Sequence, residues 1–274
     1  MKVILIDVSA FTFRYYHGMP KTICRKSDQF PTNAIVGFTH FMNALTNSQT
    51  TPYIGYALLD GGHKHRSDIQ PQYKINRKPP DNDLQRQFKV IETIPALYGF
   101  HTYRVPGYEA DDLIATISTL FESNNQISSV EILTMDKDAV QLLVNSKTYI
   151  YDFFKKKTTL TQDVIEKYGV KPGQFIDYQA LIGDHSDNIP GVKGIGPKTA
   201  VKLINEYGCI ENIPEPKFLN TPKANVIASK KVAHLVTNLQ MDLNLQQSFA
   251  NSQKVSTFMK EFDIRKKQPK ASKQ

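Results

Sequence analysis

Short apolar runs alternate along this chain with stretches of helical periodicity, and this alternation limits the possible folds more than any other feature. The runs are KVILID (2–7), YIGYALLD (53–60) and SVEILT (129–134), each of the length of a buried strand. Helical patterns cover about 34–46, 83–98 and 108–122. Strands that alternate with helices predict an α/β fold with a largely parallel central sheet flanked by helices.

The length and composition of the chain fit a folded protein without a disulfide scaffold. The 274 residues are 40% hydrophobic, which suits one large domain or one domain with a smaller annex. No apolar run is long enough for a signal peptide or a membrane span, so we expect a soluble, cytoplasmic protein with no membrane partner. Cys24 and Cys209 lack a neighbouring Cys/His pattern, which indicates reduced thiols rather than a disulfide scaffold or a zinc site.

The chain is basic, with a formal net charge of +8. Such a charge favours a polyanionic partner but predicts no particular activity. Part of the excess lies in a basic tail, residues 263–274, which ends in KKQPKASKQ. A solvated tail is the default interpretation, and phosphate contact is the alternative.

Acidic residues follow the predicted strands. Asp7 and Asp60 end the first two runs, and Asp136 and Asp138 follow the third in MDKD. Ligands of parallel sheets gather beyond the carboxyl ends of the strands, so these side chains are expected to converge. A single Asp after a strand is more typical of a turn or a helix cap, whereas for Asp136 and Asp138 alone the two interpretations are evenly balanced.

Two further acidic groups join this set. YEADDLIATIS places Glu109, Asp111 and Asp112 at the start of a helix, where acids also complement the helix dipole. Asp184 and Asp187 occur in GDHSDNIPG, a polar turn after the helical pattern of 173–182. If all groups meet, nine carboxylates share one place.

A cluster of so many acids requires positive charge, because like charges a few ångströms apart repel each other. Lysines could supply part of it. Oxygen-only ligand sets suit hard cations, above all Mg²⁺ or Mn²⁺, and two or more ions are predicted. An acidic pocket in a basic protein fits phosphodiester hydrolysis with paired metals.

A glycine-rich turn follows in GVKGIGPKTAVKLINEYG, residues 191–208. Gly194 and Gly196 allow a tight hairpin, and the next pattern is helical, which predicts a helix-hairpin-helix that holds a phosphate on backbone N–H groups. A turn that merely packs is the alternative. The predicted DNA contacts are Lys193, Gly194, Gly196, Lys198 and Thr199.

Basic and aromatic residues lie near the first two acids. Lys74 and Arg77 could bind phosphates and Tyr73 could stack on an unpaired base, although an ordinary solvated loop is nearly as good an interpretation. Arg14, in FTFRYYHG, is a candidate phosphate clamp. His17 is expected to be packed or exposed rather than catalytic.

Taken together, LIDVSAFTFRYYH, LLDGGHKHR, QYKINRKPP, YEADDLIAT, TMDKDAVQLL and GDHSDNIPGVKGIGPKTA resemble the 5′-nuclease family. The resemblance is to the 5′→3′ exonuclease domain of bacterial DNA polymerase I and its free-standing relatives, over residues 1 to about 245. It implies a PIN-like α/β core at 1–170 with a helical arch at about 63–95. It also implies a helical region at 171–262 with the helix-hairpin-helix at about 183–208.

The resemblance also implies roles for individual residues. One metal centre would use Asp7, Asp60, Glu109 and Asp111, and a second would use Asp112, Asp136, Asp138, Asp184 and Asp187, some through water. Arg14, Lys74 and Arg77 match positions that contact the scissile phosphate, and Tyr73 matches the arch aromatic. A K⁺ ion would sit near the backbone carbonyls of Val192 and Ile195.

The function implied is a structure-specific 5′ nuclease, acting as a monomer on DNA with 5′ flaps, nicks or free 5′ ends in replication or repair. Two alternatives are a DNA-binding protein without turnover and a metal-dependent ribonuclease acting on RNA or RNA–DNA hybrids. A phosphatase with an aspartyl nucleophile is disfavoured, because Ser9 stands where its second acid is needed. The basic end mildly favours a free-standing nuclease over a fragment of a polymerase.

Overall fold

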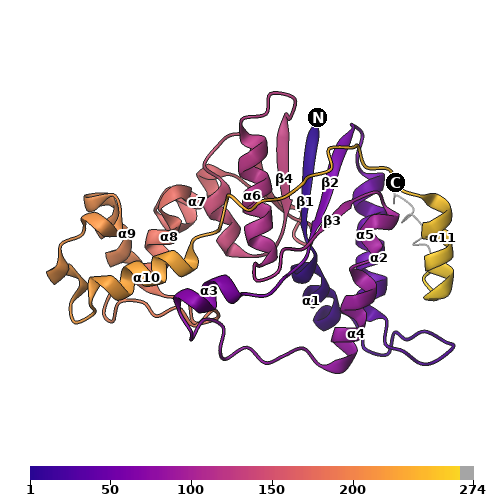
Figure 1. Ribbon diagram of the computed structural model, residues 1–274, viewed down its shortest axis with the longest axis horizontal. Helices are drawn as coiled ribbons and strands as arrows, with labels where there is room; N and C mark the ends of the chain where they lie inside the picture. Colours follow the sequence, from indigo (N-terminus) through magenta and orange to yellow (C-terminus); the bar gives the residue numbers. More distant parts are fainter. Residues whose placement is uncertain (266–274) are drawn as a thin grey trace, which may run out of the picture.

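The computed structural model describes residues 1–265. Figure 1 shows a central sheet between two layers of helices, with a group of further helices extending to one side. The predicted α/β fold with a largely parallel sheet is confirmed.

The sheet has six strands in the order β3-β2-β1-β4-β5-β6. The strands are β1 Lys2–Asp7, β2 Tyr53–Leu58, β3 His101–Tyr103, β4 Ser129–Leu133, β5 Thr148–Asp152 and β6 Lys157–Thr159. The first five are parallel, and β6 runs antiparallel to β5. The strand order reverses at β1, which puts the topological switch point at the carboxyl end where Asp7 lies.

Alternate residues of the central strands face two separate hydrophobic cores. On one face Val3 and Leu5 pack with the helix α6 Ala110–Glu122. On the other face Ile4 and Ile6 pack with a second layer of helices. That layer contains α1 Val8–Gly18, α2 Asn33–Asn47, α4 Asn82–Ile91, α5 Ile94–Leu97 and α11 Ser252–Glu261.

Helix α1 is absent from the sequence expectations. It starts directly after β1, with Asp7 as its N-cap: the Asp7 carboxylate accepts a hydrogen bond from the Ala10 N–H at 2.9 Å. Its buried residues include Phe11, Thr12 and Tyr16, but the dense aromatic run FTFRYY hides their helical spacing. The strand-to-helix turn therefore presents the side chains of α1 at the carboxyl edge of the sheet.

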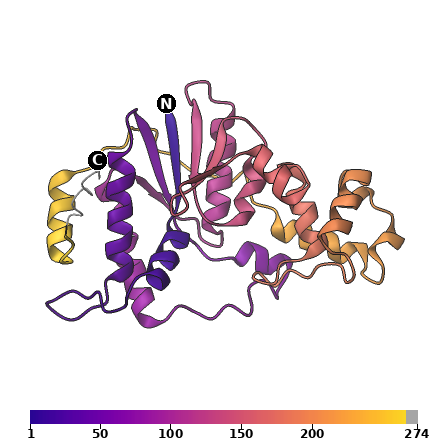
Figure 2. The ribbon, with the colours of Figure 1, turned by 180° about the vertical axis from the view of Figure 1, so that it is seen from behind.

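The segment expected to form an arch is only partly helical. It contains the short helix α3 Lys64–Ile69, a series of turns to Asn76 and an extended stretch before α4. Figures 1 and 2 show this chain running from α3 to α4 past the carboxyl edge of the sheet.

The side group of helices follows α7 Thr161–Tyr168. It comprises α8 Phe175–Ile182, α9 Pro197–Tyr207 and α10 Lys223–Ala233, with the short 3₁₀ turns η2 Pro172–Gln174, η3 Ile210–Asn212 and η4 Glu215–Phe218. A further 3₁₀ turn, η1 Lys137–Leu142, follows β4. Buried residues of α8 and α9, such as Leu181 and Ile204, belong to the same core as one face of the sheet.

An extended segment returns from α10 across the sheet to α11, as Figures 1 and 2 show. The Asn244 N–H donates to the Tyr103 hydroxyl at 2.7 Å, and the Ser248 N–H donates to the Tyr53 carbonyl at 3.0 Å. Within residues 1–265 no helix is long and apolar enough to cross a membrane. Of the predicted basic tail, residues 266–274 lie outside the described part.

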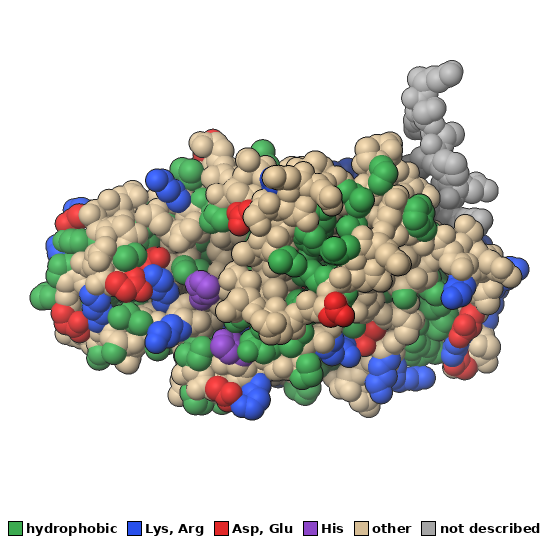
Figure 3. All heavy atoms as spheres, turned by 45° about the horizontal axis from the view of Figure 1, so that its top comes forward, with side chains coloured by type: hydrophobic (Ala, Val, Ile, Leu, Met, Phe, Trp, Pro, Cys, Tyr) green, Lys and Arg blue, Asp and Glu red, His purple; other side chains and the backbone are tan. Residues whose placement is uncertain are grey.

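Figure 3 brings the top of Figure 1 forward and so displays the side of the sheet away from α1. Basic and acidic side chains are interspersed on this face, without a large patch of one sign.

Candidate active site

The first acids gather at the carboxyl edge, as their positions after the strands predict. Asp7 is buried, and its carboxylate also accepts a hydrogen bond from the Thr134 hydroxyl at 2.9 Å. Burial and then the neighbouring charge of Asp60, with a smaller effect of Asp136, raise the pKa of Asp7 to about 7. Asp7, Asp60 and Asp136 follow three different strands, and they lie close enough for the charges of the other two to raise the pKa of Asp7.

Asp111 adds a fourth carboxylate from the first turn of α6. Its Oδ1 atom is buried and has no hydrogen-bond partner. Burial, followed by the charges of Asp136 and Asp7, raises the pKa of Asp111 well above its ordinary value. A buried, unpartnered carboxylate oxygen is costly unless a cation binds it.

Asp138 lies two residues after Asp136, in the first turn of η1, and its N–H donates to Asp136 Oδ1 at 2.8 Å. Burial and then the charges of Asp136 and Asp187 raise the pKa of Asp138 to about 7. Its Oδ1 accepts a hydrogen bond from the Gln179 amide at 2.9 Å, and the same amide donates to Asp184 at 3.1 Å. Gln179 of α8 therefore joins the acids of the sheet to those of the GDHSDN turn.

Asp184 differs from these acids because a lysine neutralises it. Lys137 Nζ lies 2.7 Å from Asp184 Oδ2. Burial raises the pKa of Asp184, but hydrogen bonds from Lys137 and Ser186 outweigh that effect and hold it at about 2.

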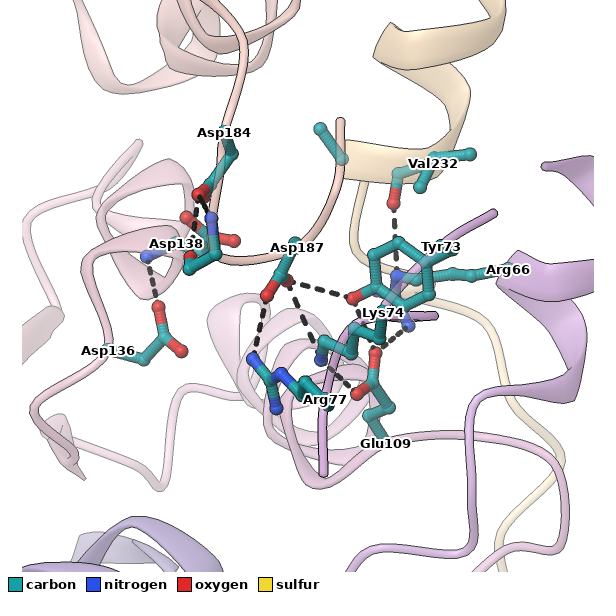
Figure 4. Close-up of polar contacts among 12 residues, drawn as sticks. Arg66, Tyr73, Lys74, Arg77, Glu109, Asp136, Asp138, Asp184, Asp187 and Val232 are labelled. Carbon is teal, nitrogen blue, oxygen red and sulfur yellow. Dashed lines mark hydrogen bonds and ion pairs between the residues drawn. The ribbon is translucent and has the colours of Figure 1, made fainter. Parts of the chain in front are cut away.

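Basic side chains of the arch segment also reach the acids, as Figure 4 shows. Lys74 forms an ion pair with Glu109 and lies 3.6 Å from Asp187, and Arg77 Nη2 lies 2.7 Å from Asp187 Oδ1. Lys74 and Arg77 therefore contact carboxylates in this structure. The resemblance implies that they contact a scissile phosphate.

Tyr73 does not offer the stacking surface that was expected. Its side chain is 4% exposed, and its hydroxyl lies 2.9 Å from Glu109 Oε2 and 3.0 Å from Asp187 Oδ2. Burial and then these two carboxylates raise the pKa of Tyr73, so the phenol stays protonated and donates. The ring cannot stack on a base without leaving this position.

Asp112 lies beside Glu109 and is engaged by a base. It is fully buried and forms a two-fold hydrogen-bonded ion pair with Arg66 at 2.6 and 2.8 Å. Its Oδ2 also accepts a hydrogen bond from the Glu109 N–H at 3.1 Å, so it caps the start of α6. In this structure Asp112 caps the helix and pairs with Arg66, and its role as a metal ligand stays a prediction.

The remaining acids fit divalent cations in their chemistry. Across residues 1–265 no three His, Cys, Asp or Glu side chains stand in a ready metal-binding arrangement. Lys74, Arg77 and Lys137 engage oxygens of Glu109, Asp187 and Asp184 in ion pairs. The donors are all oxygens, and the free Oδ1 of Asp111 lies among them, which suits a hard cation once these bases withdraw.

Arg14 is exposed on α1 and contacts none of the acids. Its guanidinium carbon lies 5.3 Å from the centre of the Phe154 ring. His17 is also exposed, and its ring is stacked on that of Phe13 with centroids 6.3 Å apart, which agrees with a packed rather than catalytic histidine.

The glycine-rich turn forms the hairpin between α8 and α9. Gly194 has a φ of +91°, which favours glycine, and Gly196 is the N-cap of α9. All five predicted contact residues of this turn are exposed: Lys193, Gly194, Gly196, Lys198 and Thr199. The side chains of Val192 and Ile195 are buried, and the Val192 carbonyl accepts a hydrogen bond from the Ile195 N–H at 3.0 Å. The K⁺ site there stays a prediction.

Several residues of the site escaped the sequence interpretation. Arg66 stands among other basic residues in HKHR, and Thr134 and Gln179 are polar residues in apolar runs. Ser9 donates to Asp60 at 2.5 Å. None of these has a spacing that distinguishes it, because each acts on an acid far away in the sequence.

The chain thus combines a largely parallel sheet that has an acidic carboxyl edge with a group of helices that contains a glycine-rich hairpin. Residues 2–169 match the family model of the 5′-3′ exonuclease N-terminal resolvase-like domain, and residues 170–256 match that of the 5′-3′ exonuclease C-terminal SAM fold. The chain belongs to the 5′-3′ exonuclease family.

Similar proteins include both long and short chains. DNA polymerase I of Rhizobium leguminosarum is 36% identical over 260 residues, which cover 89% of this chain and 25% of that protein. The 5′-3′ exonuclease of Aquifex aeolicus is 33% identical over 246 residues, covering 88% of this chain and 83% of that protein. This chain thus spans about a quarter of the polymerase I relative.

Solved structures agree in fold. Zinc-bound T5 5′-exonuclease is 27% identical with a TM-score of 0.63, covering 85% of this chain and 86% of that one. The catalytic core of Rad2 in complex with DNA substrate is 16% identical with a TM-score of 0.60, covering 94% of this chain and 86% of that one. At that identity the likeness to Rad2 concerns the fold alone.

Proposed function

We propose that this chain is a structure-specific 5′ nuclease, a 5′→3′ exonuclease and flap endonuclease that hydrolyses DNA near 5′ ends in replication or repair. One observation carries the proposal: five carboxylates meet at the carboxyl edge without a basic partner. They are Asp7, Asp60, Asp111, Asp136 and Asp138, none of which forms an ion pair within the described residues. Acids gathered in this way, several of them buried, are stable as an ionised group only when cations join them.

The cations are proposed to be two or more Mg²⁺ or Mn²⁺ ions. Asp7, Asp60, Glu109 and Asp111 would hold one, and Asp136, Asp138, Asp184 and Asp187 would hold another. Paired divalent cations supply an activated water and stabilise the leaving oxygen in phosphodiester hydrolysis. The structural relatives include T5 5′-exonuclease with zinc ions, which supports divalent binding by this fold.

The basic residues of the arch segment are proposed to exchange partners during binding. Lys74 and Arg77 neutralise Glu109 and Asp187 here, and the entry of cations would release both side chains. Released, they lie beside the acidic edge, where their charge would attract and orient a phosphate. Arg14, exposed on α1, would add a third positive charge at the same edge.

DNA is the proposed partner, bound by a monomer in the cytoplasm. The exposed hairpin at 193–199 would hold the duplex by its phosphates without reading bases, with K⁺ near the Val192 and Ile195 carbonyls. The Rad2 catalytic core, which shares this fold, was solved in complex with a DNA substrate, and that complex is consistent with the assignment.

The test is cleavage of end-labelled 5′-flap, nicked, gapped and blunt DNA with Mg²⁺ or with EDTA. We expect short products from the 5′ end in Mg²⁺ and none in EDTA. Binding of flaps without cleavage in either Mg²⁺ or Mn²⁺ would contradict the proposal and favour the non-catalytic alternative. Preferred cleavage of RNA flaps or RNA–DNA hybrids would favour the ribonuclease.

The hairpin should govern the salt dependence of binding. The double variant Lys193→Ala/Lys198→Ala is expected to lower the slope of log affinity against log salt by about 2, because each lost phosphate contact removes about one released counterion. The matched control is Lys254→Ala/Lys260→Ala on α11, which removes the same charge at the opposite end of the molecule (Figure 1). Equal slopes for both double variants, measured by fluorescence anisotropy, would exclude the hairpin as the duplex site.

With Tyr73 buried, Phe13 is the better candidate for stacking on an unpaired base. It is 40% exposed on α1, stacked on His17 and 5.3 Å from the ring of Phe88. Phe13→Ala is expected to weaken binding of a single-stranded 5′ flap about 10-fold, since base–aromatic stacking contributes about 1–3 kcal/mol. Phe249→Ala, at a 70% exposed ring on the C-terminal segment, is the control and should change nothing. Unaltered flap affinity in Phe13→Ala would exclude Phe13 as the stacking partner of the unpaired base.

A further inference from the structure

Arg66 is a buried arginine at the base of the arch segment, on α3, and is 3% exposed. Its guanidinium donates to both Asp112 oxygens at 2.6 and 2.8 Å and to the Val232 carbonyl at 3.0 Å. Arg66 Nη1 also lies 3.2 Å from Glu109 Oε2. One side chain thus contacts the arch segment's neighbour α6 and the end of α10, as Figure 4 shows in part.

Asp112 uses the rest of its acceptor capacity on backbone groups of two further segments. Its Oδ2 accepts from the Glu109 N–H at 3.1 Å, and its Oδ1 accepts from the Val236 N–H at 2.9 Å. Val236 begins the extended segment that crosses the sheet to α11. The Asp112 carboxylate therefore holds the backbone of Glu109, a proposed metal ligand. It also holds the backbone of Val236, where the chain leaves the helical region.

This geometry differs from that of a pair which contributes only stability. Burying two charges costs several kcal/mol for each ion, and apolar residues of equal size often stabilise a protein as well. Here the contacts of the pair reach the start of α6, the end of α10 and the extended segment after it, and Glu109 receives two of them: the guanidinium at its carboxylate and Asp112 at its backbone. Groups that orient a metal ligand from behind typically change metal affinity or activity 10–100-fold when lost.

We propose that Arg66 and Asp112 are a positioning pair, which orients Glu109 toward the acidic edge and fixes the helical region relative to it. The proposal rests on the nuclease function proposed above. It replaces the expectation from the sequence that Asp112 is itself a metal ligand. The buried ion pair then adds a link through α10 between the hairpin that would hold the duplex and the site of cleavage, beside the link that Gln179 makes from α8.

The two interpretations of Asp112 predict opposite effects of removing its partner. If Asp112 were a ligand that Arg66 masks, Arg66→Met would free the carboxylate and tighten the binding of divalent cations. If the pair positions Glu109, both Arg66→Met and Asp112→Asn weaken cation binding. Because both substitutions disrupt one unit, the double variant should then be no weaker than the worse single variant.

The experiment is calorimetric titration of the full chain with Mn²⁺ at a temperature where circular dichroism shows every variant folded. We expect Arg66→Met, Asp112→Asn and the double variant each to lose about 10–100-fold in Mn²⁺ affinity with unchanged stoichiometry. Flap cleavage by the same variants should show a lower kcat with little change in KM, since the DNA-contacting surface is intact. Arg66→Lys, which keeps the charge, should recover part of both quantities.

The control is Glu131→Gln, which disrupts the ion pair of Lys2 and buried Glu131 (2.7 Å) in the same sheet, away from its carboxyl edge. It should lower the melting temperature and leave Mn²⁺ affinity and kcat unchanged. The proposal is overturned if Arg66→Met tightens Mn²⁺ binding, if Asp112→Asn removes a bound ion, or if the pair variants behave like the control. Wild-type protein that binds Mn²⁺ but cleaves nothing would refute the nuclease function while the variant pattern still tests the pair.

Discussion

Asp7→Asn is expected to slow cleavage of a 5′ flap about 1,000-fold or more in Mg²⁺. Asp7 lies at the switch point of the sheet with Asp60 and Asp136 beside it, so its carboxylate is central to the proposed cation site. Cation stabilisation of the transition state supplies several kcal/mol, and about 4 kcal/mol corresponds to about 1,000-fold in rate. Single-turnover cleavage of a labelled flap measures the effect.

We expect the Asp7→Asn variant to fold. Asparagine is as good an N-cap as aspartate, so the bond from the Ala10 N–H can persist at the start of α1. Asp28→Asn is the matched control, because Asp28 is an exposed carboxylate paired with Arg25 in the loop between α1 and α2. DNA binding should persist in both variants. Cleavage at the wild-type rate by folded Asp7→Asn would remove the acidic edge from the mechanism.

The second large effect is a loss of stability with rising pH in the absence of divalent cations. The folded-state pKa values of Asp7 and Asp138 are raised from 3.8 to about 7. A group with a raised folded pKa contributes stability that is present at low pH and is lost as the pH rises toward that value. For Asp7 alone the part of this shift that lies between pH 5.5 and about 7 corresponds to about 2 kcal/mol, or a fall of about 5 °C in Tm.

Thermal unfolding in EDTA at pH 5.5 and pH 8 tests this expectation. Groups with lowered pKa values, such as Asp28 and Asp184 at about 2, have the opposite sign but titrate below this window. Millimolar Mn²⁺ should abolish the pH dependence, because bound cations keep the acids ionised, and Asp7→Asn should reduce it in EDTA. Stability that rises from pH 5.5 to 8 in EDTA, or that ignores Mn²⁺, would mean that these acids do not form one cluster.

Local patterns in the sequence were sufficient for the central strands β1, β2 and β4 and for the place of the first acids, but not for β3, β5 and β6. Strand runs are read from short apolar segments, and the carboxyl ends of parallel strands meet at one edge whatever the details of packing. Asp7, Asp60 and Asp136 follow from that rule alone, and the structure brings them together. The sequence did not predict helix α1, because its aromatic residues occupy both buried and exposed positions and so hide the helical period.

Side-chain direction near the site depended on partners far apart in the chain. Asp112 follows Asp111 directly, yet one carboxylate reaches the cluster while the other turns to Arg66, 46 residues away. Tyr73 is buried, and its hydroxyl donates hydrogen bonds to Glu109 and to Asp187, which is 114 residues away. Residue types and spacing determined which groups could take part. The contacts of the folded chain decided how each carboxylate is engaged, because both oxygens of Asp112 bind a buried guanidinium whereas Asp111 Oδ1 has no partner.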